Sequence, residues 1–378
     1  MSLPFREYHL YQLLEEYEKD QLPLDAAVHN YFRKHKALGS KDRAYLAENV
    51  YEMMRHLSLL DFFIDKTPSW SKRFEVYRNL ENIARYYEET SIPEHIRFSV
   101  PLELYQFLIK SLGQDEAQAF CRASNTQAPL TVRVNTLKTD RMTLMHNLKA
   151  QGIAVTPTPI APHGLIFQKR MTFTALEEFK KGEFEIQDEG SQLVAEMLKA
   201  QPGDLVIDYC SGAGGKTLAF APYMENKGQV YLHDIRKRAL YQARKRLKRA
   251  GIQNAQVIFS DSPILKNLKK KMDWVMVDAP CSGTGTYRRN PDMKWKFCPD
   301  LLKRLIGEQR HIFEKSLSYL KPTGSIVYAT CSVLREENLS QVEHFLKTYP
   351  LKLIEEPFKS IPTEGGMDGF FAAHFRFI

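Results

Sequence analysis

The stretch DWVMVDAPCSGTG (residues 273–285) indicates the fold, since an apolar run that ends in Pro and Gly is typical of a strand buried on both faces. A second stretch, GSIVYATCS (residues 324–332), has the same pattern and also ends near a cysteine. Open α/β sheets bind ligands just beyond the carboxyl ends of such strands. We therefore expect Cys281 and Cys331 at a ligand site, where a thiolate is a strong nucleophile.

Around these stretches, strand and helix patterns alternate from Gly203 onward, which predicts a doubly wound parallel sheet. The tail, 369–378, is predicted as a final edge strand. The other expected strands are 205–209, 229–233, 256–259, 274–277 and 325–329, and the expected helices are 236–250, 299–320 and 336–348.

Upstream of the sheet the pattern changes twice. Residues 1–125 are predicted to be a helical domain that positions RNA or a partner, and residues 126–190 a small α+β module, leaving 191–378 for the α/β domain. In the helical part, apolar residues recur at alternating spacings of four and three, which predicts one amphipathic helix with the seam Leu46, Val50, Met53, Leu57, Leu60 and Ile64.

Composition limits the classes of function. The chain has 378 residues, 43% of them hydrophobic, so a large core can form. It has no apolar run of the ~18 residues that a membrane span needs and no secretory signal pattern. Its five cysteines lack metal-ligand spacing, so we expect free thiols in the cytoplasm and no metal. We also expect a monomer.

The net charge of +8 suits a polyanionic partner. Residues 236–249 contain eight basic residues and no acid, a pattern that fits a solvated helix face and an RNA contact equally well. A second basic cluster directly follows the first cysteine stretch, and we expect phosphate contact there from Arg288, Arg289, Lys294 and Lys296.

A glycine-rich turn after the first strand is the predicted cofactor loop. DYCSGAGGKT (208–217) matches neither the Walker loop nor the dinucleotide fingerprint, yet its glycines allow a ligand to approach the backbone. Acids at the ends of the next three strands suit ribose hydroxyls and an adenine amino group, hence a nucleoside-bearing cofactor. The predicted cofactor residues are Cys210, Ser211, Gly212, Ala213, Gly214, Gly215, Lys216, Asp234, Asp261 and Asp278.

Taken together, these motifs resemble the Sun family of RNA cytosine-5 methyltransferases, which use S-adenosylmethionine. The resemblance is carried by DYCSGAGGKT, DAPCSGTG (278–285), RRNPDMKW (288–295) and YATCS (328–332), with RVNTLK (133–138), QDEGSQL (187–193) and DGFF (368–371) as flanking motifs. The helical part, especially residues 39–64, looks like that of the bacterial ribosomal-RNA members. The resemblance implies a class I methyltransferase, Rossmann-like sheet and an RNA substrate, which we expect to be ribosomal.

The resemblance also implies roles for three residues. Cys331 would add to carbon 6 of cytosine, so that carbon 5 can attack the methyl group. Asp278 would hydrogen-bond N3 and the exocyclic amine of the base, and Cys281 would assist release of the product. The family's usual CAAPGGK turn appears here as CSGAGGK (210–216), and losing a proline while gaining a glycine predicts a looser loop.

Other interpretations stay open at this point. A tRNA cytosine-5 methyltransferase and a non-catalytic RNA-binding assembly factor would share the fold. A DNA cytosine methyltransferase would take its nucleophile from Pro280-Cys281, but the Glu48-Asn49-Val50 that it would need lies far upstream. A nicotinamide-dependent oxidoreductase is disfavoured, because the fingerprint glycines are missing.

Overall fold

The computed structural model describes residues 3–20, 22–80 and 82–378. The chain forms two compact units: unit 1 comprises the chain up to Gln127 together with Thr286–Leu301, and unit 2 comprises Ala128–Gly285 together with Leu302–Ile378. The division into three domains made from the sequence remains a prediction. No helix in the described part of the chain is both long and apolar enough to cross a membrane.

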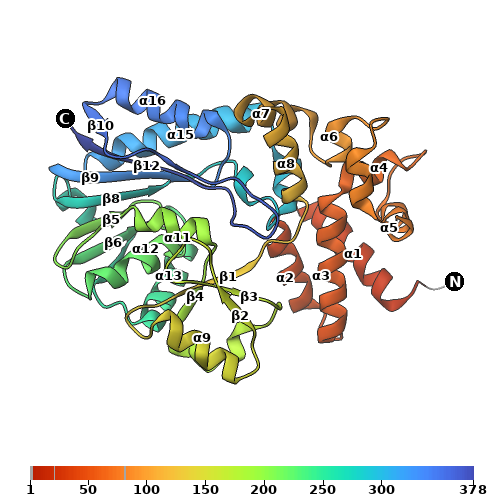
Figure 1. Cartoon of the computed structure of the whole chain (residues 1–378), viewed down its shortest axis with the longest axis horizontal. Helices are drawn as coiled ribbons and strands as arrows, with labels where there is room; N and C mark the ends of the chain where they lie inside the picture. Colours follow the sequence, from red (N-terminus) through yellow and green to blue (C-terminus); the bar gives the residue numbers. More distant parts are fainter. Residues whose placement is uncertain (1–2, 21, 81) are drawn as a thin grey trace. The chain divides into compact units, whose positions relative to one another are not determined.

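Unit 1 is helical (Figure 1). Asp42 accepts a hydrogen bond from the Gly39 N–H and so begins the helix that contains the predicted seam. The seam is not one helix, because the chain leaves helical geometry at His56 and a second short helix follows. The helices are α1 (Phe5–Asp20), α2 (Leu24–Lys34), α3 (Ser40–Arg55), α4 (Leu57–Phe62), α5 (Trp70–Asn79), η1 (Ile83–Glu88), α6 (Glu94–Arg97), α7 (Leu102–Leu112), α8 (Gln114–Ser124) and η5 (Pro291–Lys296).

The segment Thr286–Leu301 belongs to unit 1, and the burial of Arg288 and Lys294 there contradicts the phosphate contact predicted for these two residues. Arg288 and Lys294 are only 1% and 2% exposed. The Lys294 ammonium donates to the backbone oxygen of Arg55 at 2.6 Å and to Asn125 Oδ1 at 2.9 Å. Lys296 pairs with Asp292 at 2.7 Å. These side chains donate to buried acceptors, as buried polar groups in proteins usually do.

The main sheet of unit 2 confirms the predicted α/β class. Its strand order is β10-β12-β9-β8-β5-β6-β7, and the strands from β9 to β7 are parallel. Helices cover both faces (Figure 1). The elements are β5 (Leu205–Asp208), α12 (Gly215–Phe220), η3 (Ala221–Met224), β6 (Gln229–His233), α13 (Lys237–Ala250), β7 (Ala255–Ile258), α14 (Ile264–Asn267), β8 (Met272–Asp278), η4 (Thr284–Thr286), α15 (Pro299–Leu317), β9 (Leu320–Thr330), η6 (Arg335–Glu337), α16 (Leu339–Thr348), β10 (Leu351–Leu353), β11 (Phe358–Lys359) and β12 (Phe371–Phe377).

The predicted edge position of the last strand is wrong. β12 runs antiparallel between β9 and β10, and its residues Phe371–Phe375 are buried. The short strand β10 takes the edge instead. A sequence with buried residues on both faces of the strand, such as FFAAHF (370–375), fits this interior position.

A second, antiparallel sheet in unit 2 has the order β2-β3-β1-β4. Its core contains Val132, Leu144, Leu165 and Phe184. The elements here are β1 (Leu130–Val134), α9 (Arg141–Ala150), β2 (Val155–Pro157), β3 (Gly164–Phe167), η2 (Phe173–Ala175), α10 (Glu177–Lys181) and β4 (Phe184–Ile186), followed by α11 (Glu189–Glu196).

Candidate active site

The predicted site residues of unit 2 follow the carboxyl ends of adjacent strands. Because the strand order is β9-β8-β5-β6-β7, the groups line up along one edge of the sheet in a fixed order. Cys331 directly follows β9, Asp278 ends β8, the glycine-rich turn follows β5, and Asp234 follows β6. Asp261, three residues after β7, is at the far end of this row.

Cys281 and Cys331 are brought together although 50 residues separate them, with their Sγ atoms 3.4 Å apart. The two loops are joined by further bonds: the Gly285 N–H donates to the Cys331 backbone oxygen at 2.9 Å, and the Val333 N–H to Thr284 Oγ1 at 2.9 Å. Its hydrogen bond with Cys331, its burial, and the nearby Glu337 raise the pKa of the Cys281 thiol. The geometry therefore favours keeping a proton on Cys281.

Lys216 provides the positive charge of the site. Its side chain is buried, and its Nζ donates to Asp278 Oδ2 at 3.0 Å. Burial opposes the charge of the ammonium group, but Asp278, Cys331 and Asp208 raise the pKa of Lys216 above its ordinary value. The site therefore holds a buried ammonium group that pairs with Asp278.

Glu337, which the sequence did not single out, holds the loop that contains Cys281 by hydrogen bonds to the next residue, Ser282. Its carboxylate is fully buried and accepts from the Ser282 N–H at 2.8 Å, from the Ser282 hydroxyl, and from Gln309 Nε2 at 3.0 Å. Gln309 Nε2 also donates to the Pro280 backbone oxygen at 3.0 Å. In the sequence, Glu336-Glu337 has the pattern of an ordinary acidic helix start, so nothing there marked one of the two acids as buried.

Two polar groups under the glycine-rich turn have no hydrogen-bond partner within the described chain: Asp208 Oδ1 and Ser211 Oγ, both buried. Burial raises the pKa of Asp208 to about 7, while its Oδ2 accepts from the Thr217 hydroxyl at 2.7 Å. Gly212 and Gly214 have φ values of +53° and +77°, which residues with a Cβ rarely adopt. Buried polar atoms without a partner, beside glycines with positive φ, fit a turn that holds a polar cofactor.

Asp234, predicted to contact the ribose of the cofactor, already accepts four hydrogen bonds, three from Arg236 and one from Gly212. Burial opposes its charge, yet hydrogen bonds from Arg236 and Gly212 lower the pKa of Asp234. One oxygen accepts from the Gly212 N–H at 2.8 Å, so the acid is tied to the turn, and Arg236 Nε lies 3.0 Å from the other oxygen. Asp261 is different: its side chain is 76% exposed and pairs with Lys237 at 3.5 Å.

The turn that lacks the family's proline is held by side chains from outside it. Arg246 donates to the Ala213 backbone oxygen at 2.9 Å and is itself bonded to the buried Glu185. Gln187 Nε2 donates to the Gly215 backbone oxygen at 3.2 Å. Arg133, on β1, donates to Gln187 at 2.7 Å. The small sheet thus reaches the turn through two hydrogen-bonded chains.

The flanking motifs of the sequence converge on the same place. The Asp368 N–H donates to Asp188 at 3.1 Å, and the Gly369 N–H donates to the Gly285 oxygen at 2.8 Å. A Cβ on Gly285 would lie only 2.1 Å from the Gly369 oxygen, so glycine is required there. The Phe370 ring, a contact the sequence did not reveal, lies 5.3 Å from Lys216 Nζ.

Comparison with known proteins identifies two matching family models. A model described as "16S rRNA methyltransferase RsmB/F" matches residues 195–376, and one described as a ferredoxin-like domain of the RsmF/B-like methyltransferases matches residues 101–174. Both cysteines and the glycine-rich turn lie within the first match.

Similar proteins share most of the chain. A ribosomal RNA small subunit methyltransferase B of Vibrio vulnificus is 31% identical over 306 residues, covering 79% of this chain and 71% of the relative. A probable methyltransferase B of Synechocystis is 29% identical, covering 94% and 79%. The crystal structure of a methyltransferase homolog from Pyrococcus horikoshii superposes with a TM-score of 0.63 and 26% identity, covering 78% of this chain and 99% of that one.

Proposed function

Because the chain belongs to the RsmB/F family of S-adenosylmethionine-dependent 16S rRNA methyltransferases, we propose that it methylates carbon 5 of a cytosine in ribosomal RNA through a covalent cysteine adduct. The observation that carries the proposal is the cysteine pair, whose Sγ atoms lie 3.4 Å apart although 50 residues separate them. Its hydrogen bond with Cys331 and its burial raise the pKa of the Cys281 thiol, and Glu337 raises it further. Cys281 is thereby favoured as a neutral thiol, and we assign the nucleophile to Cys331, as the resemblance to the family implies.

In this proposal the Cys331 thiolate bonds to carbon 6 of the cytosine, which makes carbon 5 nucleophilic. Bound S-adenosylmethionine supplies an electrophilic methyl group, which carbon 5 takes. In this proposal Asp278, which accepts a hydrogen bond from Lys216, hydrogen-bonds the N3 and amine edge of the base and so positions the ring. A base then removes the proton of carbon 5, the electrons of that C–H bond re-form the double bond between carbons 5 and 6, and the electrons of the bond from carbon 6 to sulfur leave with Cys331 as thiolate. Cys281 assists this release.

The thiol must reach carbon 6, so the target cytosine must be unpaired or flipped out of its helix. Ribosomal RNA offers such bases in loops, where sequence-specific RNA recognition concentrates. A monomer in the cytoplasm remains our expectation for the protein's state.

The test uses two cysteine variants of the full chain with a ribosomal RNA fragment. Cys331→Ala is expected to form no adduct and to transfer no methyl group. Cys281→Ala is expected to trap a protein–RNA adduct that survives denaturing electrophoresis. An adduct from the Cys331 variant instead would reverse the two roles, and no adduct from either would overturn the covalent mechanism.

The class of RNA is tested separately. Bisulfite mapping of RNA from cells with and without this protein is expected to show one or more 5-methylcytosines lost from small-subunit ribosomal RNA. Loss from transfer RNA instead would support the tRNA enzyme, and no loss in any RNA would support a non-catalytic assembly factor.

A further inference from the structure

Helix α13 presents two kinds of cation. Arg246 and Arg249 face the small sheet, where both pair with Glu185. Arg244, Lys245 and Lys248 are exposed. No acid occurs anywhere from Ile235 to Ser260, so the sequence offers this surface no local neutralisation.

A groove of about 510 Å³ lies between the second half of α13 and the start of β7. Its polar lining comes from Arg244, Lys248, Gln253 and Gln256, and Leu247, Ile252 and Val257 provide apolar lining. β7 ends the strand order, so the groove borders a strand edge.

Lys138, from the small sheet side of the unit, adds a third cation beside this groove. A Cβ on Gly251, the residue that ends α13, would lie 3.0 Å from Lys138 Nζ. The ammonium group therefore lies over the end of the helix, next to residues that line the groove. Among the lining residues there is no Asp or Glu to compete for these cations.

The wall of the groove is preformed. Asn226 Oδ1 accepts from the Gln253 N–H at 2.8 Å, and Asn226 Nδ2 donates to the Gly251 oxygen at 3.2 Å. Asn254 Nδ2 donates to the Lys227 oxygen at 2.9 Å. Because Asn226 and Lys227 already hold the loop 251–254 by hydrogen bonds, a ligand that binds there would not have to order this loop.

We propose that the groove between α13 and β7 is a second RNA-binding site, which holds the phosphate backbone of the substrate RNA outside the catalytic site. This inference rests on the proposed function, which makes RNA the substrate. Three cations without an acid match phosphates, amide side chains suit sugar and phosphate oxygens, and apolar lining suits the face of a ribose or base.

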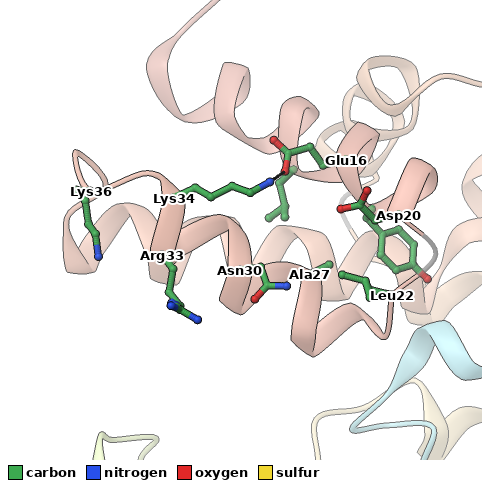
Figure 2. Close-up of a pocket in the computed structure, with 10 residues that line it drawn as sticks. Glu16, Asp20, Leu22, Ala27, Asn30, Arg33, Lys34 and Lys36 are labelled. Atoms are coloured by element: carbon green, nitrogen blue, oxygen red, sulfur yellow. Dashed lines mark hydrogen bonds and ion pairs between the residues drawn. The ribbon is translucent and has the colours of Figure 1, made fainter.

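A hollow in unit 1 differs from this groove because acidic residues line it together with basic ones. The hollow measures about 460 Å³ between α1 and α2, and its lining mixes Glu16 and Asp20 with Arg33, Lys34 and Lys36 (Figure 2). Lys34 is already paired with Glu16 at 2.9 Å. A phosphate backbone would meet two carboxylates there, so the evenly cationic groove of unit 2 is the better match.

The groove is too far from the cysteines to take part in the chemistry. It borders the amino end of β7, whereas Cys281 and Cys331 follow the carboxyl ends of β8 and β9. A four-residue strand and three inter-strand steps separate it from β8, which amounts to roughly 20 Å. The site should therefore matter for long RNA and not for a short target loop.

The experiment compares two RNAs with the full-length protein. The double variant Arg244→Glu/Lys248→Glu is expected to bind a ribosomal RNA fragment of several hairpins about tenfold more weakly. The slope of log affinity against log salt should fall by about two, since about one counterion is released per phosphate contact. Methylation of a short target oligonucleotide should keep its kcat/KM. The charge-matched control Lys266→Glu/Lys269→Glu changes two exposed lysines near α14.

Each outcome decides a separate point. Unchanged affinity of the groove variant for the long RNA overturns the proposal and leaves an acidic protein as the occupant to test. An equal loss in the control variant also overturns it, since net charge alone would then explain the effect. If the wild-type protein does not methylate the short oligonucleotide, the proposed function fails. The affinity of the groove variant for the long RNA still tests whether the groove binds RNA. A melting temperature close to wild type confirms that the variant is folded.

Discussion

Helix α13 and the segment Thr286–Leu301 are both rich in lysine and arginine, but they use these residues in opposite ways. In α13, Arg244, Lys245 and Lys248 face solvent. In the segment, Arg288 and Lys294 are almost completely buried. The difference lies in the neighbours: α13 alternates its cations with a strip of small and apolar residues, while the segment meets buried carbonyl oxygens of unit 1. The number of charges in a stretch therefore says little about whether those charges meet water.

The largest expected effect is on stability, from removing a buried cation. Lys294→Ala leaves the Arg55 oxygen and Asn125 Oδ1 without their donor and opens a cavity. We expect a loss on the order of 3 kcal/mol in the free energy of unfolding. The exposed counterpart Lys248→Ala should change it by less than about 0.5 kcal/mol. Urea unfolding of both variants measures the contrast, and equal values would remove the distinction between the two regions.

The second effect is a pH dependence that belongs to the buried region alone. Burial lowers the pKa of Lys294 to about 7, whereas the unfolded chain keeps the ordinary value of 10.5. Between these values the unfolded state binds more protons, so this residue makes stability rise with pH.

Relative to Lys294→Met, the wild-type protein should gain about 2 kcal/mol between about pH 7.5 and pH 9, since one pKa unit corresponds to about 1.4 kcal/mol. Denaturant unfolding at several pH values checks this difference. Parallel curves for the two proteins would mean that Lys294 remains charged in the folded state.

A third, smaller effect compares two neighbouring cations of α13 by their influence on cofactor affinity. Arg246→Met removes the donor to the Ala213 oxygen and leaves Glu185 with one fewer partner. We expect the glycine-rich turn to loosen and S-adenosylmethionine affinity to fall about tenfold, or about 1.4 kcal/mol. The neighbouring Lys245→Met, at an exposed position, should leave the affinity unchanged. Calorimetric titration distinguishes the two, and partial recovery in Arg246→Lys would point to the hydrogen bond itself.

The sequence predicted what depends on local patterns and missed what depends on partners. Periodicity located the parallel strands to within a few residues, and strand ends placed Cys281, Cys331 and Asp278 at one edge. It did not reveal that Lys294 is buried or that Glu337 bonds to Ser282, because both side chains look like surface residues in their own neighbourhood. Their partners are 28 to 239 residues away, and no local pattern encodes such contacts.

The smallest expected effect concerns Asp261, the exposed member of the predicted cofactor residues. Asp261 pairs with Lys237 at 3.5 Å, both side chains are exposed, and such ion pairs contribute little to stability. We therefore expect Asp261→Asn to leave the free energy of unfolding within about 0.5 kcal/mol of wild type.

Cofactor affinity gives the sharper measurement. If Asp261 accepts a hydrogen bond from the adenine amino group, Asp261→Ala should weaken S-adenosylmethionine binding about threefold to fivefold, the size of one solvent-exposed hydrogen bond. Lys237→Gln removes the ion pair but keeps the acid, so it should bind the cofactor as the wild type does. Equal affinity in all three proteins would limit Asp261 to a surface ion pair. The acids that contact the cofactor would then end at Asp234, which is buried, and the exposed Asp261 would take no part.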